Sequence, residues 1–183
     1  MKIILIGIQG SGKSTQGNLL REKLGVPYLS TGHIFRELAK EKTPTGRYIK
    51  ETMNAGFLIS DEKTVPIVAE YLSRPEYEDG YILDGFPRTI AQAREFENGI
   101  DYVVNIKVSE QVALARLTLR KGTENRADDS SNAIKQRIEQ FFTHTIPVCR
   151  YYKEKGKLIE VDGQRSIEEI HEEIMSKIKS HTS

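Results

Sequence analysis

Short apolar runs alternate along the chain with longer stretches in which apolar residues recur every three or four positions. The short runs are typical of buried strands and the longer stretches of amphipathic helices. The predicted strands span residues 2–6, 27–29, 81–84, 102–107 and 158–161. The predicted helices span residues 13–24, 61–73, 88–97, 109–120, 133–155 and 166–179. This alternation predicts an α/β fold with a parallel five-stranded sheet and helices on both faces.

Single residues refine these helices. Asp61 and Ser109 are predicted N-caps, because acidic residues follow each of them in the first helical turn. Pro147 is expected to kink the long helix over residues 133–155, because proline has no backbone N–H to donate.

Two segments depart from the alternation. Residues 30–60 contain no strand pattern and are broken at residues 43–46 and at Gly56, so we expect a small helical insertion after the second strand. Residues 121–132 are polar and rich in turn-forming residues, which predicts an exposed loop. The remaining residues are expected to form the core of a single domain over residues 1–183.

The first predicted strand leads directly into a glycine-rich turn. The segment fits the phosphate-loop pattern G-x-x-x-x-G-K-[ST], between a strand and a helix as that pattern requires. Backbone N–H groups in such a loop converge on phosphate oxygens, and the following helix directs its positive end at the same anion. Lys13 adds a mobile cation, and the Ser14 hydroxyl can ligate Mg²⁺. The predicted phosphate-binding residues are Gly10, Ser11, Gly12, Lys13, Ser14 and Thr15.

A second polar cluster follows the third predicted strand. Asp84 ends this strand, and ligands of parallel sheets bind beyond the carboxyl ends of strands. Asp84 is therefore a candidate to orient the water shell of Mg²⁺, with a cap of the 88–97 helix as the alternative. Gly85 permits close approach of a ligand. Arg88 opens the predicted helix with an unfavourable positive charge, so we interpret it as a phosphate ligand for a second substrate.

Four further arginines extend this chemistry. Arg116 and Arg120 are four residues apart on one predicted helix face, and Arg126 follows in the polar loop. Arg137 lies beside an apolar helix face, where it forms an interior ion pair or binds an anionic ligand. Each alone is most often a surface charge, but together with a phosphate loop these guanidinium groups indicate phosphate binding.

Composition excludes several other classes of protein. The net charge of +1 gives no electrostatic reason to expect binding to nucleic acid or to a membrane surface. A single cysteine, Cys149, excludes an internal disulfide and a cysteine-rich zinc site, and its apolar context predicts a buried thiol. The first strand begins at once and no long apolar run follows, so we expect no signal peptide, no membrane span and a cytoplasmic location.

Several of these motifs, in this order, resemble the adenylate kinases of the short-lid type within the nucleoside monophosphate kinases. The supporting segments are residues 7–16, 30–32 with Arg36, Gly56 with 60–62, 84–89 with 92–93, Arg116, Arg120, 126–129, Arg137 and 162–163. The resemblance implies a phosphate-loop NTPase fold with core residues 1–29, 61–120 and 134–183. Residues 30–60 would be the monophosphate-binding insertion and residues 121–133 a short lid.

The same resemblance implies roles for individual residues. Arg36 and Arg88 would hold the AMP phosphate. Adenine of AMP would meet Thr31, Gly85 and Gln92, beneath the backbone of Phe57, Leu58 and Ile59. Arg120, Arg126 and Arg137 would surround the transferred phosphoryl group, with Asp128 and Asp129 holding the lid arginines. Arg116 and Gln164 would lie near the adenine of ATP.

The implied reaction is reversible phosphoryl transfer from MgATP to AMP, giving two ADP. Its partners would be ATP, AMP and ADP alone, and we expect a monomer. His33 replaces an aspartate that is usual in the family, and the predicted lid is too short for a zinc-binding hairpin, so no structural zinc is expected.

Three alternatives stay open at this point. A UMP/CMP kinase has the same fold and chemistry, although Thr31 and Gln92 favour adenine. A nucleotide-dependent binding switch is disfavoured because the guanine-reading segment Asn-Lys-x-Asp is absent. A kinase that modifies nucleic acid is disfavoured by the near-zero net charge.

Overall fold

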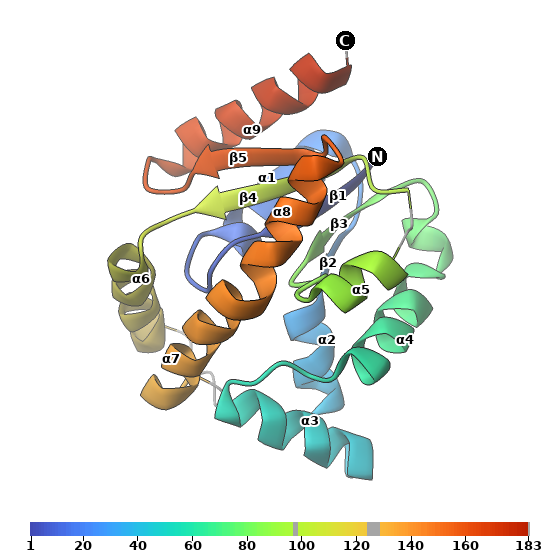
Figure 1. The fold of residues 1–183 in the computed structure, drawn as a ribbon, viewed down its shortest axis with the longest axis vertical. Helices are drawn as coiled ribbons and strands as arrows, with labels where there is room; N and C mark the ends of the chain where they lie inside the picture. The colour runs from blue at the N-terminus through green and yellow to red at the C-terminus, as the bar shows by residue number, and fades with distance from the viewer. Residues whose placement is uncertain (97–98, 124–128, 183) are drawn as a thin grey trace.

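A single parallel sheet forms the centre of the molecule (Figure 1). The computed structural model describes residues 1–96, 99–123 and 129–182, and for residues 120–123 and 181–182 it describes the backbone alone. The strands are β1 (Lys2–Ile6), β2 (Tyr28–Ser30), β3 (Tyr81–Asp84), β4 (Tyr102–Lys107) and β5 (Leu158–Asp162). They pair in the order β2-β3-β1-β4-β5, and every pairing is parallel. The predicted α/β class and five-stranded sheet are therefore confirmed, with strand ends within one residue of those expected.

Helices cover both faces of this sheet, as expected. The helices are α1 (Lys13–Leu24), α2 (Thr31–Leu38), α3 (Pro44–Ala55), α4 (Asp61–Leu72), α5 (Ile90–Glu95), α6 (Glu110–Thr123), α7 (Ser131–Gln140), α8 (Ile146–Glu154) and α9 (Ile167–Thr182). A short 3₁₀ turn, η1 (Pro75–Tyr77), and a π-helical turn, η2 (Phe141–Thr145), complete the described elements. Helices α1 and α9 cover one face, and α4, α5 and α8 cover the other (Figure 1).

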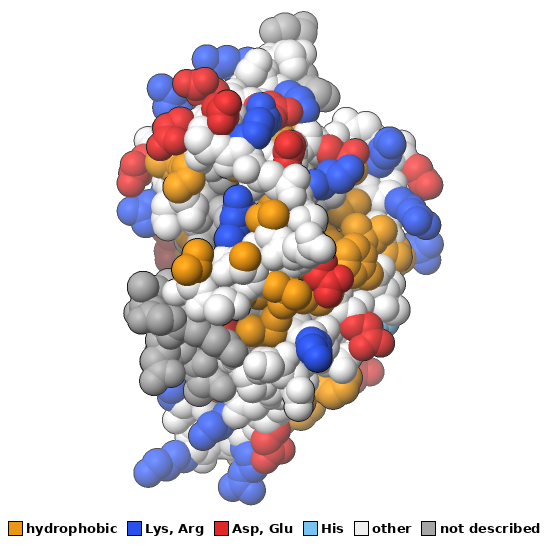
Figure 2. All heavy atoms as spheres, turned by 90° about the vertical axis from the view of Figure 1, so that its left-hand side faces the viewer, with side chains coloured by type: hydrophobic (Ala, Val, Ile, Leu, Met, Phe, Trp, Pro, Cys, Tyr) orange, Lys and Arg blue, Asp and Glu red, His pale blue; other side chains and the backbone are white. Residues whose placement is uncertain are grey.

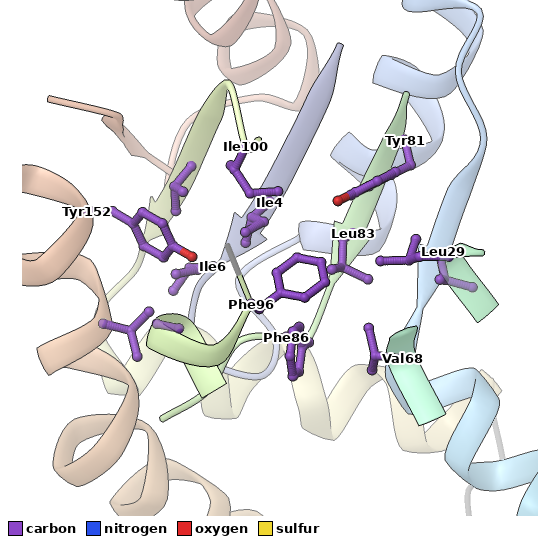
Figure 3. Close-up of a cluster of buried hydrophobic side chains, with 14 of the residues drawn as sticks. Ile4, Ile6, Leu29, Val68, Tyr81, Leu83, Phe86, Phe96, Ile100 and Tyr152 are labelled. Atoms are coloured by element: carbon purple, nitrogen blue, oxygen red, sulfur yellow. The ribbon is translucent and has the colours of Figure 1, made fainter. Parts of the chain in front are cut away.

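Alternate residues of the central strand divide between two hydrophobic clusters. Ile3 and Leu5 pack toward α1 and α9, whereas Ile4 and Ile6 pack toward α4, α5 and α8. Figure 3 shows the second cluster, in which the rings of Phe86 and Phe96 meet edge to face with centroids 5.0 Å apart. Both faces of β1 are buried, as a central parallel strand requires.

The helix predicted over residues 133–155 is divided into two helices. Helix α7 runs into the π-helical turn η2, and α8 then begins at Ile146. The π turn lies just before Pro147, which cannot donate the backbone hydrogen bond that continues an α-helix. A departure from regular α-helix therefore lies directly before Pro147, where the sequence predicts a kink.

Two predictions about the N-termini of helices are wrong. Helix α4 begins at Asp61 itself, whose carboxylate accepts hydrogen bonds from Thr89 and Gln92 instead of capping its own helix. Helix α5 begins at Ile90 because the Thr89 side chain accepts from the Gln92 backbone N–H, so Arg88 precedes this helix and does not open it. The Ser109 prediction is confirmed, since its hydroxyl accepts from the Val112 backbone N–H at 3.3 Å before α6 begins.

Helices α2 and α3 extend away from the carboxyl end of β2, at the lower end of the molecule in Figure 1. Phe35, Ile49 and Ile59 form a small hydrophobic cluster there, separate from the two clusters on the sheet. Residues 30–60 therefore have a helical structure and an apolar centre of their own.

The side of the molecule that carries α6 and α7 has a mixed surface. Figure 2 shows acidic and basic side chains next to one another at the upper end and hydrophobic side chains across the middle. Leu114 and Leu119 of α6 and Phe142 of η2 are exposed. In the described part of the chain, no helix has the length and apolar character needed to cross a membrane.

Candidate functional site

A cavity of about 420 Å³ opens at the carboxyl ends of the central strands. It is bounded by the turn after β1, the insertion formed by α2 and α3, the segment after β3, and the helices α6 and α7. Predicted site residues that line it are Gly10, Gly12, Lys13, Ser14, Thr15, Arg36, Phe57, Leu58, Ile59, Asp84, Gly85, Arg88, Gln92, Arg116 and Arg137. The fold thus brings residues from distant parts of the sequence to one cavity, which we call the central cavity.

The glycine turn after β1 is shaped by close contact with α6. Gly10 has a φ of +86°, and a Cβ on it would lie 2.7 Å from the Ala113 carbonyl oxygen. The Lys13 Nζ donates to the Gly7 and Ile8 carbonyl oxygens at 2.7 and 3.1 Å. The lysine ammonium therefore lies over the turn, next to the positive N-terminal end of α1.

Arg116 connects this turn with the loop after β5. Its guanidinium donates to the Gly163 carbonyl at 2.8 Å and to the Ser11 carbonyl at 3.4 Å. Gln164 does not line the central cavity, and its side-chain oxygen accepts from the Ser109 backbone N–H at 3.3 Å. Arg116 thus contacts Gly163, the neighbour of Gln164, which the resemblance assigns to the adenine of ATP.

Three guanidinium groups, of Arg36, Arg88 and Arg137, lie near one another at the central cavity. The Arg88 Nε donates to the Gly85 carbonyl at 2.7 Å, and the Thr145 hydroxyl donates to the Arg88 carbonyl at 3.1 Å. Burial lowers the pKa of Arg88. The nearby charges of Arg137 and Arg36 lower this pKa further by repulsion, and the opposite charge of Asp84 partly offsets the lowering. A site of this charge favours a multiply charged anion.

Arg137 is held by a buried carboxylate. Its guanidinium donates to Asp129 Oδ1 and to the Met53 carbonyl, each at 3.0 Å. The same Asp129 oxygen accepts from the Gln9 side chain at 3.0 Å. Asp129 therefore orients a cavity arginine and joins it to the glycine turn, while Arg137 also contacts α3 of the insertion.

The Gln92 amide is fixed by two partners. Its nitrogen donates to Asp61 Oδ1 at 2.7 Å, and its oxygen accepts from the Arg88 backbone N–H at 2.7 Å. Asp61 also accepts from the Thr89 hydroxyl at 2.9 Å. Sequence reasoning missed this role of Asp61, because the partners are 28 and 31 residues away and no local pattern relates them.

Thr31 lies behind the cavity wall and does not line it. Its side chain is 1% exposed, and its hydroxyl donates to the Asp84 carbonyl at 3.1 Å. Gly85 has a φ of +86°, and a Cβ on it would lie 2.5 Å from the Thr31 hydroxyl oxygen. The contact between Thr31 and the third strand therefore depends on a glycine at position 85.

Asp84 offers an unsatisfied oxygen near the glycine turn. The Tyr28 hydroxyl donates to Asp84 Oδ2 at 2.8 Å, whereas the buried Asp84 Oδ1 has no hydrogen-bond partner among the described residues. Burial, together with the charge of Asp84, raises the pKa of Tyr28, so this hydroxyl stays a donor. Both Asp84 and Ser14 line the central cavity. The unsatisfied Asp84 oxygen and the Ser14 hydroxyl fit a Mg²⁺ ion that contacts some of its protein ligands through water.

Four other residues named in the sequence analysis do not contribute a described side chain to the cavity. His33 is exposed on α2 and does not line the central cavity. Arg126, Asp128 and the side chain of Arg120 lie outside the described residues. Within the described ranges, no group of three or more His, Cys, Asp and Glu side chains could hold a metal ion without further ligands.

Comparison with known proteins identifies the family. Residues 5–157 match the sequence model of the adenylate kinase family. An adenylate kinase of Bacillus velezensis is 37% identical over 208 residues, covering 95% of this chain and 96% of the relative. Adenylate kinases of Bacillus subtilis (36% identical, 95% of this chain and 96% of the relative) and Methylobacterium radiotolerans (37%, 99% and 97%) are similar over comparable spans. The chain therefore belongs to the adenylate kinase family, whose members use MgATP, and has adenylate kinase activity.

Proposed function

We propose that the central cavity holds both substrates of the transfer at once, with their phosphates directed toward each other. The observation that carries this proposal is that one cavity is lined both by the glycine turn with Lys13 and by Arg36, Arg88 and Arg137. Two separate cationic groups, the glycine turn with Lys13 and the three arginines, fit two phosphate-bearing ligands better than a single such ligand. ATP takes the glycine turn through Gly10, Ser11, Gly12, Lys13, Ser14 and Thr15, with Arg116, Arg120 and Gln164 beside it.

The AMP phosphate binds Arg36 and Arg88, and the AMP base lies toward the insertion. Phe57, Leu58 and Ile59 supply apolar lining for a flat ring, and Gln92 supplies an amide. Because Asp61 and the Arg88 N–H fix both ends of that amide, Gln92 reads the base from one orientation only. Thr31 acts from behind Gly85, by supporting the wall against which the base packs.

Mg²⁺ completes the proposed site. Ser14 would bind the ion directly and Asp84 through water, which would satisfy the orphaned Asp84 oxygen. The ion supplies charge neutralisation for the β- and γ-phosphates when it is bound. We propose no structural zinc.

The protein residues carry out the transfer by positioning and charge. An AMP phosphate oxygen is already ionised near neutral pH, so no general base is required. Lys13 and Arg137 stabilise the negative charge on the transferred group, and Arg120 and Arg126 join them from the proposed lid, residues 121–133. Closure of this lid and of the insertion, residues 30–60, would exclude water and so prevent hydrolysis of ATP.

We further propose that the enzyme is a cytoplasmic monomer whose partners are ATP, AMP and ADP. The mixed surface charge and the net charge of +1 support a protein with small-molecule partners over one that binds nucleic acid or a membrane surface.

The test is a coupled assay of ATP with AMP, UMP, CMP and GMP in the parent protein and in two variants at position 31. Thr31→Ser keeps the hydroxyl that donates to the Asp84 carbonyl. Thr31→Val keeps the shape of the side chain and removes this hydroxyl. We expect the parent to prefer AMP, Thr31→Ser to retain that preference, and Thr31→Val to lower it by roughly tenfold, the value of one pocket contact. A parent that prefers UMP or CMP contradicts the acceptor assignment; an unchanged preference in Thr31→Val contradicts the role of Thr31 alone.

A further inference from the structure

The hydroxyl of Tyr28 lies between the two residues proposed to hold Mg²⁺. It donates to Asp84 Oδ2 at 2.8 Å and also interacts with the side chain of Ser14. Ser14 belongs to the first turn of α1, and Asp84 ends β3, so these residues come from different elements. Tyr28, at the start of β2, is the side chain that links them.

The Tyr28 ring cannot shift freely, because it packs directly on the backbone of α1. A Cβ on Gly17 would lie 2.4 Å from Cε2 and 2.7 Å from Cδ2 of the Tyr28 ring. Gly17 follows Ser14 by one helical turn and is itself buried. The position of the hydroxyl is therefore set by the packing of β2 against α1, two regular elements of the fold.

We propose that Tyr28 is a positioning residue for the metal site, which it serves by fixing the Asp84 carboxylate. Its hydroxyl donates a hydrogen bond to Asp84 Oδ2, so the second carboxylate oxygen, Oδ1, can accept a hydrogen bond from water bound to Mg²⁺. Tyr28 touches neither substrate in this arrangement. The inference rests on the proposed assignment of Asp84 and Ser14 to Mg²⁺.

This arrangement explains why a tyrosine stands opposite a helix glycine. A glycine inside a helix is destabilising relative to alanine, so its presence in α1 requires a reason. The close approach of the Tyr28 ring supplies that reason. The ring alone would fill the space as phenylalanine does, so the hydroxyl is the part of Tyr28 that packing does not require.

Tyr28→Phe separates these two contributions, because it keeps the ring and removes the hydroxyl. Tyr77→Phe is the matched control, since Tyr77 lies in η1 away from the central cavity. Asp84→Asn tests the underlying metal assignment in the same experiment. The readout is the affinity of each protein–ATP complex for Mn²⁺, followed by electron paramagnetic resonance without AMP so that no transfer occurs. Affinity for ATP in excess EDTA and the thermal midpoint are measured alongside.

For Tyr28→Phe we expect the Mn²⁺ affinity of the ATP complex to fall about tenfold, the lower end of the effect of losing a partner of a metal-ligating group. Affinity for metal-free ATP should change less than about twofold, because no phosphate contact is removed. Tyr77→Phe should change neither value, and Asp84→Asn should weaken Mn²⁺ binding at least as much as Tyr28→Phe does.

Each contrary result has a definite meaning. If Asp84→Asn weakens Mn²⁺ binding and Tyr28→Phe does not, the positioning role of Tyr28 is overturned and the metal assignment stands. If Asp84→Asn has no effect, the assignment of Asp84 fails, and the inference about Tyr28 fails with it. Equal weakening of metal-free and metal-loaded ATP binding in Tyr28→Phe, with a lower thermal midpoint, would make Tyr28 a purely structural residue.

Discussion

Replacing Arg88 with methionine is expected to impair AMP use without weakening the fold. The Arg88 guanidinium is buried, and its burial lowers its pKa. The charge of Asp84 raises this pKa, and the charges of Arg137 and Arg36 lower it. The Arg88 side chain donates to the Gly85 carbonyl, a bond that methionine cannot make. Methionine has a similar length, so the variant removes the charge and retains most of the packing.

Two opposing contributions set the magnitude of this effect. Charge-assisted bonds to the AMP phosphate contribute about 1.5–3 kcal/mol, so kcat/KM for AMP should fall roughly 10- to 150-fold. Loss of the bond to Gly85 alone would lower the free energy of unfolding by about 1 kcal/mol. Removal of a buried positive charge beside two others offsets this loss. We therefore expect the unfolding free energy of Arg88→Met to equal or exceed that of the parent protein.

The assay combines steady-state kinetics with thermal unfolding at several AMP concentrations. A ligand at one hundred times its Kd stabilises the native state by about 2.7 kcal/mol, so AMP should raise the Tm of the parent clearly. The same AMP concentrations should raise the Tm of Arg88→Met much less, whereas the shift produced by ATP should match that of the parent. Arg94→Met is the control, because Arg94 is exposed on α5 and does not line the central cavity.

Two results would refute this reasoning. A marked loss of stability in Arg88→Met without AMP would show that the guanidinium contributes favourably to the fold, contrary to the cost expected from its burial. A loss of ATP-induced stabilisation equal to the loss of AMP-induced stabilisation would show that Arg88 does not select the acceptor phosphate.

Three further predictions concern other parts of the molecule. Lys13→Ala should lower the rate by several orders of magnitude and leave the circular dichroism spectrum unchanged, because the side chain contributes charge at the cavity and little packing; near-full activity would exclude the phosphate-loop role. Asp61→Asn should lower kcat/KM for AMP about tenfold with an unchanged KM for ATP, since an amide cannot accept from both Thr89 and Gln92; an equal effect on ATP would contradict this. Burial raises the pKa of the Cys149 thiol to about 12, so a thiol reagent should modify it only after unfolding. The thiol is neutral in both the folded and the unfolded protein below its ordinary pKa of 9.0, so its contribution to the free energy of unfolding should be constant below that pH. This contribution should fall as the pH rises from 9.0 toward about 12. Rapid labelling of the folded protein at pH 8 would contradict the buried environment.

Features encoded in neighbouring residues could be predicted from the sequence. The glycine turn and its lysine form a contiguous pattern, and the Ser109 cap involves residues three apart. The five strands follow from short apolar runs, because a parallel strand buried on both faces contains few polar residues. The order of the strands in the sheet required the structure, since the runs carry no information on which strands are adjacent.

Features that depend on tertiary contact could not be predicted. Asp61 has the residue type and place of a helix cap, but its carboxylate bonds to Thr89 and Gln92 from a different helix. The hydrogen bond from the Thr31 hydroxyl to the Asp84 carbonyl likewise joins residues that are 53 positions apart. In both cases the partner of a polar group lies far away in the sequence, where no local pattern indicates it.

The strand order also has a consequence for how the chain acquires its structure. Strand β1 is made first but lies at the centre of the sheet, where Lys2 is aligned with Tyr81 and Ile3 with Tyr102. Its two neighbours are thus synthesised some 80 and 100 residues later. The apolar strand β1 therefore has no partner strand during most of the synthesis of the first hundred residues. Contacts between residues so distant in sequence slow folding and leave strand edges exposed to association with other chains. During synthesis this protein therefore has its greatest exposure to aggregation before β3 and β4 emerge.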